Sequence, residues 1–336
     1  MALQTSGAIS LLNIQNEFGG SNPIAISEYY GAASGIPTSG LISISNFYGA
    51  SAVQLPTIAL NAGGILGYAP QKTVTRLNVN GTLIGTETVA TNNMSDNGAA
   101  GLNQIAVCLF VNKVERIGSN GTTLSSSTIA SDFIDGRAGA KTSTVGVYYG
   151  GSTYSNKTFT YFNNVVRLTE AGVVYGSQTY IGTKRRALGG AGTDSNISIF
   201  HGGVTTNNTY TNILTRISDS GTIIGSESNI GTALSYGSGA KNGNTGIFYG
   251  GANGSNSINI AKIINTSGTL QVSETSIGTA RTAIGASDVG GISIFFGGSI
   301  GIQQYNRVTR LSSTATIIGS ETSVGTARSN IGATGI

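Results

Sequence analysis

Gly246-Ile247-Phe248-Tyr249-Gly250-Gly251 is a short apolar run that ends in a double glycine. Similar runs end at Tyr149-Gly150-Gly151, His201-Gly202-Gly203 and Phe296-Gly297-Gly298. The first glycines of these four pairs, taken in chain order, are 52, 48 and 47 residues apart. A short apolar run bounded by glycines is typical of a buried strand. Its return at a nearly constant interval indicates a fold made of repeats.

Further phrases return at matching places in each repeat. After the double glycine come a variable segment, a strand phrase such as Val308-Thr309-Arg310-Leu311, a turn, and a closing phrase such as Gly325-Thr326-Ala327-Arg328. The turn position is held in successive units by Gly81, Gly121, Gly172, Gly221, Gly268 and Ala315. The sequence therefore contains six units, each with four short β runs.

The size of the unit predicts the architecture. Four strands in about 47 residues match one propeller blade, and a closed ring protects strand edges without the polar caps that a linear array needs. The last unit stops at 332–336, where another apolar strand should begin, and such a strand is found near the front at Gly64-Ile65-Leu66-Gly67-Tyr68. We therefore expect an all-β fold: a six-bladed β-propeller over 51–336, whose last blade is completed by an N-terminal strand at about 64–68.

Residues from about 60 to 336 resemble the kelch family of propellers. The resemblance rests on a double glycine after an apolar strand with an Arg upstream of it, as in Arg281 and Gly297-Gly298. The Trp that this family carries late in each blade is missing, because the chain contains no Trp, so the fold is kelch-like. The resemblance implies partner binding through loops between strands and implies no catalytic residue.

The first fifty residues carry a different and shorter repeat. Ile26-Ser27-Glu28-Tyr29-Tyr30-Gly31-Ala32 and Ile44-Ser45-Asn46-Phe47-Tyr48-Gly49-Ala50 match at an offset of 18 residues, and Leu11-Leu12-Asn13-Ile14 is a looser third copy. Each copy predicts a brief strand followed by an aromatic pair and a glycine turn. Since a piece of this size buries little surface alone, we expect 1–50 to be a small β-rich or irregular anchor.

Residues 3–50 also resemble the N-terminal segments of phage tail and other virion proteins. The matching phrases are Ser6-Gly7-Ala8-Ile9-Ser10 and Ser39-Gly40-Leu41-Ile42-Ser43, which in that class precede diverse C-terminal modules. The resemblance implies docking onto other tail or baseplate proteins of a virion. The side chains expected at the docking surface are Ile9, Leu11, Ile14, Phe18, Ile26, Tyr29, Tyr30, Ile44, Phe47 and Tyr48.

The composition excludes several classes of protein. Only 10% of residues are charged and 51 are Gly, yet Ile, Val, Tyr and Phe recur regularly, which argues against disorder. The net charge of +4 is scattered, with Lys184-Arg185-Arg186 as its densest run, so no nucleic-acid partner is indicated. No basic N-terminus precedes a long apolar run, and no stretch is long enough for a membrane span. We therefore expect synthesis in a host cytoplasm, no membrane insertion, and a final place in a virion tail.

The sequence indicates no catalytic or metal site. His201 stands where sister units have Tyr or Phe, so it is interpreted as a substitution at a structural position. Cys108 lies in an apolar run and is expected in the core. One His and one Cys cannot form a zinc or copper site, which excludes the galactose-oxidase type of kelch enzyme. We expect no cofactor and no enzymatic activity.

Repeated and unrepeated acids lead to different expectations. Glu87, Glu227, Glu274 and Glu321 hold equivalent positions, with Gln178 in a fifth unit. Repetition favours a structural bond, to an Arg of the same or the adjacent blade, over a single active site. The unrepeated acids leave open a glycosidase with two converging carboxylates. They are Asp96, Glu115, Asp132, Asp135, Glu170, Asp194, Asp219 and Asp288.

The variable segments after the double glycines are the candidate ligand-binding surface. They are Ser152 to Asn163, Val204 to Asn212, Ala252 to Asn259 and Ser299 to Asn306. Equivalent connections in a ring are related by its rotation, so we expect them on one face. Their Tyr, Ser and Asn content is typical of adaptable recognition surfaces. The candidate ligand-binding residues are Tyr154, Tyr161, Phe162, Tyr210, Gln303 and Tyr305.

The leading functional hypothesis is a structural protein of a phage tail. It docks through its N-terminal segment and presents the propeller for binding to a host-surface glycan or receptor. Two alternatives remain open from the sequence. One is a purely architectural virion component, such as a decoration, a spacer or a baseplate part. The other is a host-glycan depolymerase, for which the unrepeated acids are the only support.

Overall fold

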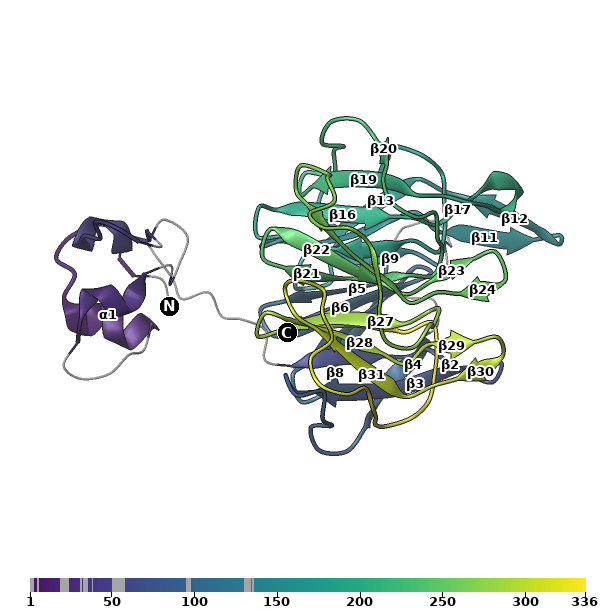
Figure 1. Cartoon of the computed structure of the whole chain (residues 1–336), viewed down its shortest axis with the longest axis horizontal. Helices are drawn as coiled ribbons and strands as arrows, with labels where there is room; N and C mark the ends of the chain where they lie inside the picture. Colours follow the sequence, from purple (N-terminus) through teal and green to yellow (C-terminus); the bar gives the residue numbers. More distant parts are fainter. Residues whose placement is uncertain are drawn as a thin grey trace. The chain divides into compact units, whose positions relative to one another are not determined.

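The computed structural model describes residues 3–4, 6–18, 24–30, 32, 36–37, 39–49, 58–94, 98–129, 134 and 136–336, apart from the side chain of Asn207. The chain divides into two compact units, Met1–Leu55 and Pro56–Ile336. The larger unit is a six-bladed β-propeller (Figure 1). The described part of the smaller unit contains one α-helix and two 3-10 helices.

Six antiparallel sheets form the blades in the described part of the propeller, as the sequence predicts. The strands of each blade are given from the inside outward. The first two blades are β5 Gly98–Leu102, β6 Ile105–Phe110, β7 Lys113–Gly118 and β8 Thr123–Thr128, followed by β9 Ala138–Lys141, β10 Gly146–Tyr149, β13 Asn164–Leu168 and β14 Thr179–Tyr180. The next three are β15 Gly189–Ala191, β16 Ile197–His201, β19 Ile213–Ser218 and β20 Ser228–Asn229; β21 Ser238–Asn242, β22 Thr245–Tyr249, β25 Ile260–Asn265 and β26 Thr275–Ser276; and β27 Gly285–Val289, β28 Ile292–Phe296, β31 Arg307–Leu311 and β32 Thr322–Ser323. The sixth blade consists of β33 Gly332–Gly335, β1 Ala59–Ala62, β3 Ala69–Leu77 and β4 Thr88–Met94, with β2 Ile65–Leu66 paired to β3. The inner strands β5, β9, β15, β21, β27 and β33 contact their neighbours in this order, and β33 contacts β5, so the ring is closed.

The two ends of the propeller meet in the sixth blade, but the closing strand lies a few residues before its expected place. β1 pairs with β33, with Ala59 opposite Gly335 and Ala62 opposite Gly332. The sequence predicted this strand at about 64–68. Gly63-Gly64 is in fact the double glycine of this blade, so its apolar strand precedes the pair and β2 follows it. The prediction missed β1 because its small residues and buried Asn61 give a weak apolar signal.

Small residues allow the inner strands to approach one another closely. A Cβ added to Gly192 would lie 1.7 Å from the carbonyl oxygen of Lys141 in the neighbouring blade, and one added to Gly335 would lie 1.8 Å from that of Asp288. A cavity of about 20 Å³ lies among these inner strands. Larger apolar side chains fill the spaces between blades, where Tyr249 packs on Phe295 with ring centroids 5.2 Å apart.

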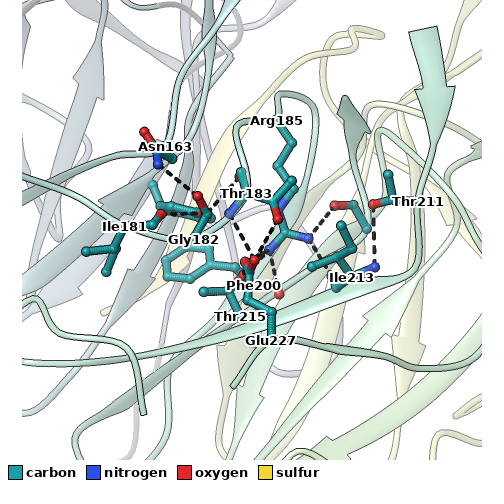
Figure 2. A network of polar contacts seen from close by, with 12 residues as sticks. Asn163, Ile181, Gly182, Thr183, Arg185, Phe200, Thr211, Ile213, Thr215 and Glu227 are labelled. Carbon is teal, nitrogen blue, oxygen red and sulfur yellow. Dashed lines mark hydrogen bonds and ion pairs between the residues drawn. The ribbon is translucent and has the colours of Figure 1, made fainter. Parts of the chain in front are cut away.

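A polar network joins each blade to the linker that enters it, and Figure 2 shows one copy. Glu227 accepts hydrogen bonds from the backbone N–H of Thr183 at 2.9 Å and from its hydroxyl at 2.6 Å. The fully buried Arg185 donates to the carbonyl oxygen of Gly202 at 3.0 Å and to the hydroxyl of Thr215, and it lies 3.9 Å from Glu227. We call this arrangement the junction latch. Burial alone would raise the pKa of the Glu227 carboxyl, but these hydrogen bonds and the charge of Arg185 hold it below its ordinary value.

The junction latch recurs around the ring, which confirms the structural bond predicted from the repeated Glu residues. One further copy joins Thr279, Glu321 and Arg281, in which the N···O distance of the ion pair is 3.7 Å. The copy at the closing junction joins Thr326, Glu87 and Arg328. In each copy the Glu belongs to one blade and the Thr to the linker from the blade before it. The acids that repeat are therefore structural groups of the ring.

At one junction two residues differ from the other latches, and the second change compensates for the first. Leu234 stands where the other latches have Arg, and Lys262 stands in β25 where Thr215 stands in β19. The ammonium of Lys262 lies 2.5 Å from Glu274 and donates to the carbonyl oxygen of Thr232 at 3.1 Å. Since a partly buried carboxylate needs a nearby cation, Lys262 supplies from β25 the cation that the linker arginine supplies in the other latches.

The predicted brief strands are wrong for the described residues of the smaller unit, which form helical turns instead of strands. Its phrases form α1 Leu11–Phe18 and the 3-10 helices η1 Ile26–Tyr29 and η2 Ile44–Phe47. Capping side chains explain the difference, because the side chain of Asn46 accepts a hydrogen bond from the Ser43 backbone N–H at 2.8 Å. Such local bonds stabilise a first helical turn. The apolar residues that suggested short strands lie instead on the inner faces of these turns.

Candidate functional site

The variable segments after the double glycines form hairpins rather than open loops. They are β11 Ser152–Ser155 with β12 Thr158–Tyr161, β17 Val204–Thr205 with β18 Thr209–Tyr210, β23 Ala252–Asn253 with β24 Asn256–Ser257, and β29 Ser299–Ile300 with β30 Gln303–Gln304. A 3-10 turn, η3 Thr206–Asn208, connects β17 to β18. Figure 1 shows these hairpins on one side of the propeller, where β2 also lies. We call the surface made by the four hairpins and β2 the hairpin face.

Side chains link neighbouring hairpins to one another. The hydroxyl of Tyr161 donates to the side-chain oxygen of Asn208 at 3.1 Å, and that of Tyr210 donates to the carbonyl oxygen of Gly254 at 2.9 Å. Gln304 accepts a hydrogen bond from the backbone N–H of Gly67 at 3.2 Å. Two of the candidate ligand-binding residues, Tyr161 and Tyr210, therefore help to hold the hairpin face together.

The other candidate ligand-binding residues differ in their exposure. Tyr154 is 64% exposed, and its ring centroid lies 4.7 Å from that of Phe159 on the same hairpin. Gln303 is exposed at the tip of another hairpin. Phe162 and Tyr305 occupy equivalent, partly buried places after their hairpins, where their backbone N–H groups bond to a double glycine. Among these four, Tyr154 offers the widest aromatic surface to a ligand.

A pocket of about 300 Å³ opens between the linkers that enter the blades. Four linker residues on its wall have left-handed backbone conformations: Ala187 (φ 56°), Tyr236 (φ 53°), Ala283 (φ 55°) and Asn330 (φ 55°). They are joined in sequence by backbone hydrogen bonds of 2.7–2.8 Å, each N–H donating to the carbonyl of the residue in the preceding linker. A strained backbone held by such bonds makes a rigid wall. We call this cavity the axial pocket.

Arg186 and Phe159 also line the axial pocket, together with Ser152. The guanidinium of Arg186 lies 4.0 Å from the ring centroid of Phe159 and donates to the hydroxyl of Tyr236 at 2.8 Å. A second cavity of about 610 Å³ adjoins this wall, since it shares Tyr236, Ala283 and Asn330 and is also lined by Gln304. The sequence prediction did not include Phe159, Arg186 or Tyr236. Arg186 and Tyr236 lie in linkers, outside the variable segments from which the candidates were chosen. Phe159 lies inside one of those segments, from which Tyr154, Tyr161 and Phe162 were named instead.

Three of the unrepeated acids that the structure describes are engaged with other groups. Asp288 lies 3.1 Å from the ammonium of Lys141, and Asp194 pairs with Lys241. The buried Glu115 accepts hydrogen bonds from the Thr91 and Asn92 backbone at 2.6 Å and 3.1 Å. Asp96, Asp132 and Asp135 lie outside the described residues. Among the described residues that line the two cavities, none is acidic.

The two residues considered for chemistry at the sequence level are buried. The Nε2 of His201 bonds to the carbonyl oxygen of Ile230 at 2.9 Å, much as the hydroxyl of Tyr249 bonds to Thr279 in a sister blade. Burial and the nearby charge of Lys262 lower the pKa of His201 to about 3. Burial also raises the pKa of the Cys108 thiol well above its ordinary value. Within the described ranges, no group of three or more His, Cys, Asp or Glu side chains is placed to hold a metal ion.

The smaller unit uses most of the expected docking side chains for its own packing. Ile14, Tyr29 and Phe47 are buried, with the Tyr29 and Phe47 ring centroids 6.0 Å apart. Those that pack against this core are Ile9, Phe18, Ile26 and Ile44. Leu11, Tyr30 and Tyr48 remain 37–40% exposed. The seven packed side chains therefore hold the unit together, and only the last three are available to a partner.

No protein family model matches the chain, and no curated protein matches its sequence. None of the helices in the described ranges is long and apolar enough to cross a membrane.

Proposed function

We propose that the chain is a structural protein of a phage tail that binds carbohydrate of the host surface through its hairpin face. The observation that carries the binding part is the juxtaposition of exposed aromatic rings with a rigid concave wall. Phe159 lines the axial pocket and its ring packs on that of Tyr154. Most of the other lining residues are Gly, Ala, Ser and Asn, and the larger ones include Arg186 and Tyr236. Sugars present an apolar ring face and many hydroxyls, which suit aromatic surfaces and small hydrogen-bonding groups in a concave site.

The virion part of the proposal rests on the resemblance of residues 3–50 to N-terminal segments of virion proteins. Leu12 is 58% exposed and Leu41 is 92% exposed, beside the partly exposed Leu11, Tyr30 and Tyr48. These exposed apolar side chains are the ones that we assign to the contact with another virion protein. Docking through these residues would leave the propeller to face the host.

The carbohydrate-binding part is tested with the full chain on an array of bacterial surface polysaccharides. The wild type should bind a subset of them, and the Tyr154→Ala/Phe159→Ala double variant should lose at least about tenfold in affinity, as expected for aromatic anchors. The matched control is Tyr180→Ala, because Tyr180 is 58% exposed in β14, an outer strand. Equal binding by the wild type and the double variant would reject the hairpin face as the site. The absence of any binding would favour the purely architectural alternative.

The docking part is tested by sedimentation of a lysate of phage-infected cells. The wild-type chain should sediment with tailed particles. The Leu12→Asp/Leu41→Asp variant should remain in the soluble fraction, since a carboxylate at an apolar contact is costly to bury. Leu124→Asp is the control, because Leu124 is 50% exposed on the propeller strand β8. Unchanged sedimentation of the double variant would remove Leu12 and Leu41 from the docking surface.

A further inference from the structure

Arg186 is held by aromatic groups and has no carboxylate partner among the described residues. Its guanidinium carbon lies 4.0 Å from the ring centroid of Phe159, 5.8 Å from that of Tyr161 and 5.9 Å from that of Tyr236. Its Nη1 donates to the hydroxyl of Tyr236 at 2.8 Å. Its Nη2 makes no hydrogen bond with the described residues and is not a buried atom. The charged group is therefore fixed in place with a donor left for a ligand.

Other internal arginines of this chain are treated differently. Arg185, Arg281 and Arg328 are fully buried, and each lies within 4.0 Å of a Glu carboxylate in its junction latch. In these three latches the ring supplies a carboxylate counter-ion to the buried arginine. Arg186 is adjacent in sequence to one of these residues but faces the axial pocket instead of a latch. Its role is not explained by the structural pattern that the chain repeats.

Arg186 and Tyr236 also break the repeat at the positions they occupy. The residues equivalent to Arg186 in sister linkers are Ser235, Thr282 and Ser329, and those equivalent to Tyr236 are Ala187, Ala283 and Asn330. A short side chain is therefore sufficient for the fold at both places. The two large exceptions come from successive linkers and meet through the hydrogen bond between the guanidinium and the phenol. Such a pair, unique in the described ring, points to a ligand rather than to packing.

The described lining of the axial pocket contains no acidic side chain. Arg137 and Arg186 are its only charged residues in the described ranges, and Arg137 is buried with its guanidinium bonded to the carbonyl oxygen of Val111 at 2.7 Å. A concave, low-dielectric site with one sign of charge attracts ligands of the opposite sign. A planar guanidinium matches the two oxygens of a carboxylate. Phe159, 38% exposed, offers a ring face beside it.

We infer that the axial pocket recognises the carboxylate of an acidic sugar residue, with Arg186 as its anion-binding group and Phe159 as the surface under the sugar ring. This inference rests on the proposed carbohydrate binding and narrows it to saccharides that carry uronic or other sugar acids. The pocket volume of about 300 Å³ is at the lower end of ordinary ligand sites, which fits one or two sugar residues of a longer polymer. Tyr236 acts as a positioning residue, because it orients the guanidinium.

The test uses the full chain on the polysaccharide array, with neutral and carboxylate-bearing glycans in equal numbers. The glycans that bind most tightly should carry carboxylates. Chemical reduction of those carboxylates to alcohols should weaken binding about ten- to a hundredfold, as expected for loss of a charge-assisted hydrogen bond. Arg186→Gln should weaken binding to the same extent and should make the variant insensitive to carboxyl reduction. Lys184→Gln is the matched control, because it removes the same charge two residues away at an exposed side chain.

The outcomes separate this inference from the function on which it rests. Preferred binding to neutral glycans, or carboxyl reduction without effect, overturns the acidic-sugar assignment and leaves carbohydrate binding intact. Equal weakening by Arg186→Gln and Lys184→Gln shows a general charge effect and also overturns it. Absence of binding to every glycan rejects both proposals. Arg186→Lys keeps the charge but loses the planar stacking group, so an intermediate affinity is expected, and thermal unfolding of each variant verifies that the ring remains folded.

Discussion

Arg328 and Glu87 form an ion pair of 3.2 Å across the ends of the propeller, although 241 residues separate them in sequence. Arg328 also donates to the carbonyl oxygen of Asn61 at 3.0 Å and to the hydroxyl of Thr75 at 2.7 Å. Both acceptors belong to strands of the sixth blade. The closing junction is therefore held by the same latch as junctions that lie within the continuous chain.

The first prediction concerns this latch. Arg328→Met should lower the free energy of unfolding by about 3–5 kcal/mol, because it leaves the partly buried carboxylate of Glu87 without its cation. Arg281→Met, at a junction inside the chain, should lower it by a similar amount. Urea denaturation followed by tyrosine fluorescence measures both. A much smaller loss for Arg328→Met than for Arg281→Met would mean that the closing junction depends on other contacts.

The second prediction concerns the compensated exchange at Glu274. Lys262→Thr alone should destabilise the propeller by about 3–5 kcal/mol, since the carboxylate loses its buried partner. The double variant Lys262→Thr/Leu234→Arg restores the residues of the other latches and should recover most of this loss. A double-mutant cycle from urea denaturation measures the coupling.

Lys241→Thr supplies the control for that cycle. Its ion pair with Asp194 is more exposed, so its loss should cost no more than about 1 kcal/mol. If Leu234→Arg brings no recovery in the background of Lys262→Thr, the two positions are not interchangeable sources of the cation.

The third prediction concerns pH. The pKa of His201 in the folded protein, about 3, lies below the value near 6.5 expected on unfolding, so the unfolded chain binds a proton that the folded chain excludes. Stability should therefore fall as the pH drops below about 6.5. Between pH 7 and pH 5 this residue should account for a loss of about 2 kcal/mol.

His201→Phe removes that group while keeping a residue type found at the equivalent place, Phe296. Urea denaturation at pH 7, 6 and 5 should show a flatter profile for this variant than for the wild type. The latch carboxylates Glu87, Glu227, Glu274 and Glu321 contribute little in this range. Their pKa values in the folded chain lie below the ordinary value of 4.5, so the stability that they add is lost mainly as the pH falls below 4.5. Identical slopes for the two proteins would contradict a buried neutral imidazole.

The fourth prediction concerns the close approach of the inner strands. Gly192→Ala would place a methyl carbon 1.7 Å from the Lys141 carbonyl oxygen, so two blades would have to separate. It should cost more than about 3 kcal/mol, the upper end for overpacking. Gly301→Ala, at a hairpin tip with open space around it and φ of 58°, should cost about 1 kcal/mol from backbone strain alone. Similar melting temperatures for the two variants would indicate that the inner strands of neighbouring blades lie farther apart than the structure shows.

The repeated double glycines made the propeller predictable, because a phrase such as Phe296-Gly297-Gly298 marks both the end of a buried strand and the turn that follows it. The position of the closing strand was missed where this signal weakens, at Ala59–Ala62. The smaller unit was misjudged for a different reason. Its copies are so short that side-chain caps such as Asn46 decide between an extended and a helical turn, and periodicity does not detect them.

The candidate site was only partly predictable. The sequence marked out the variable segments after the double glycines, which it treated as loops and which are hairpins. The axial pocket is made by linkers that come together only in the closed ring. A signal for it was present: Arg186 and Tyr236 replace short residues of sister linkers. Comparing repeats for exceptions, rather than for agreement, would have identified both positions. Their contact with each other depends on the angle between successive blades, which no local pattern contains.

The most direct measurement for the account as a whole is a crystal structure of the full chain with an oligosaccharide from its best-bound acidic polysaccharide. The account predicts a sugar ring on Phe159, with its carboxylate within hydrogen-bond distance of the Arg186 Nη2, inside the axial pocket. A sugar bound on the outer strands or on the opposite side of the ring, with the pocket empty, would contradict it.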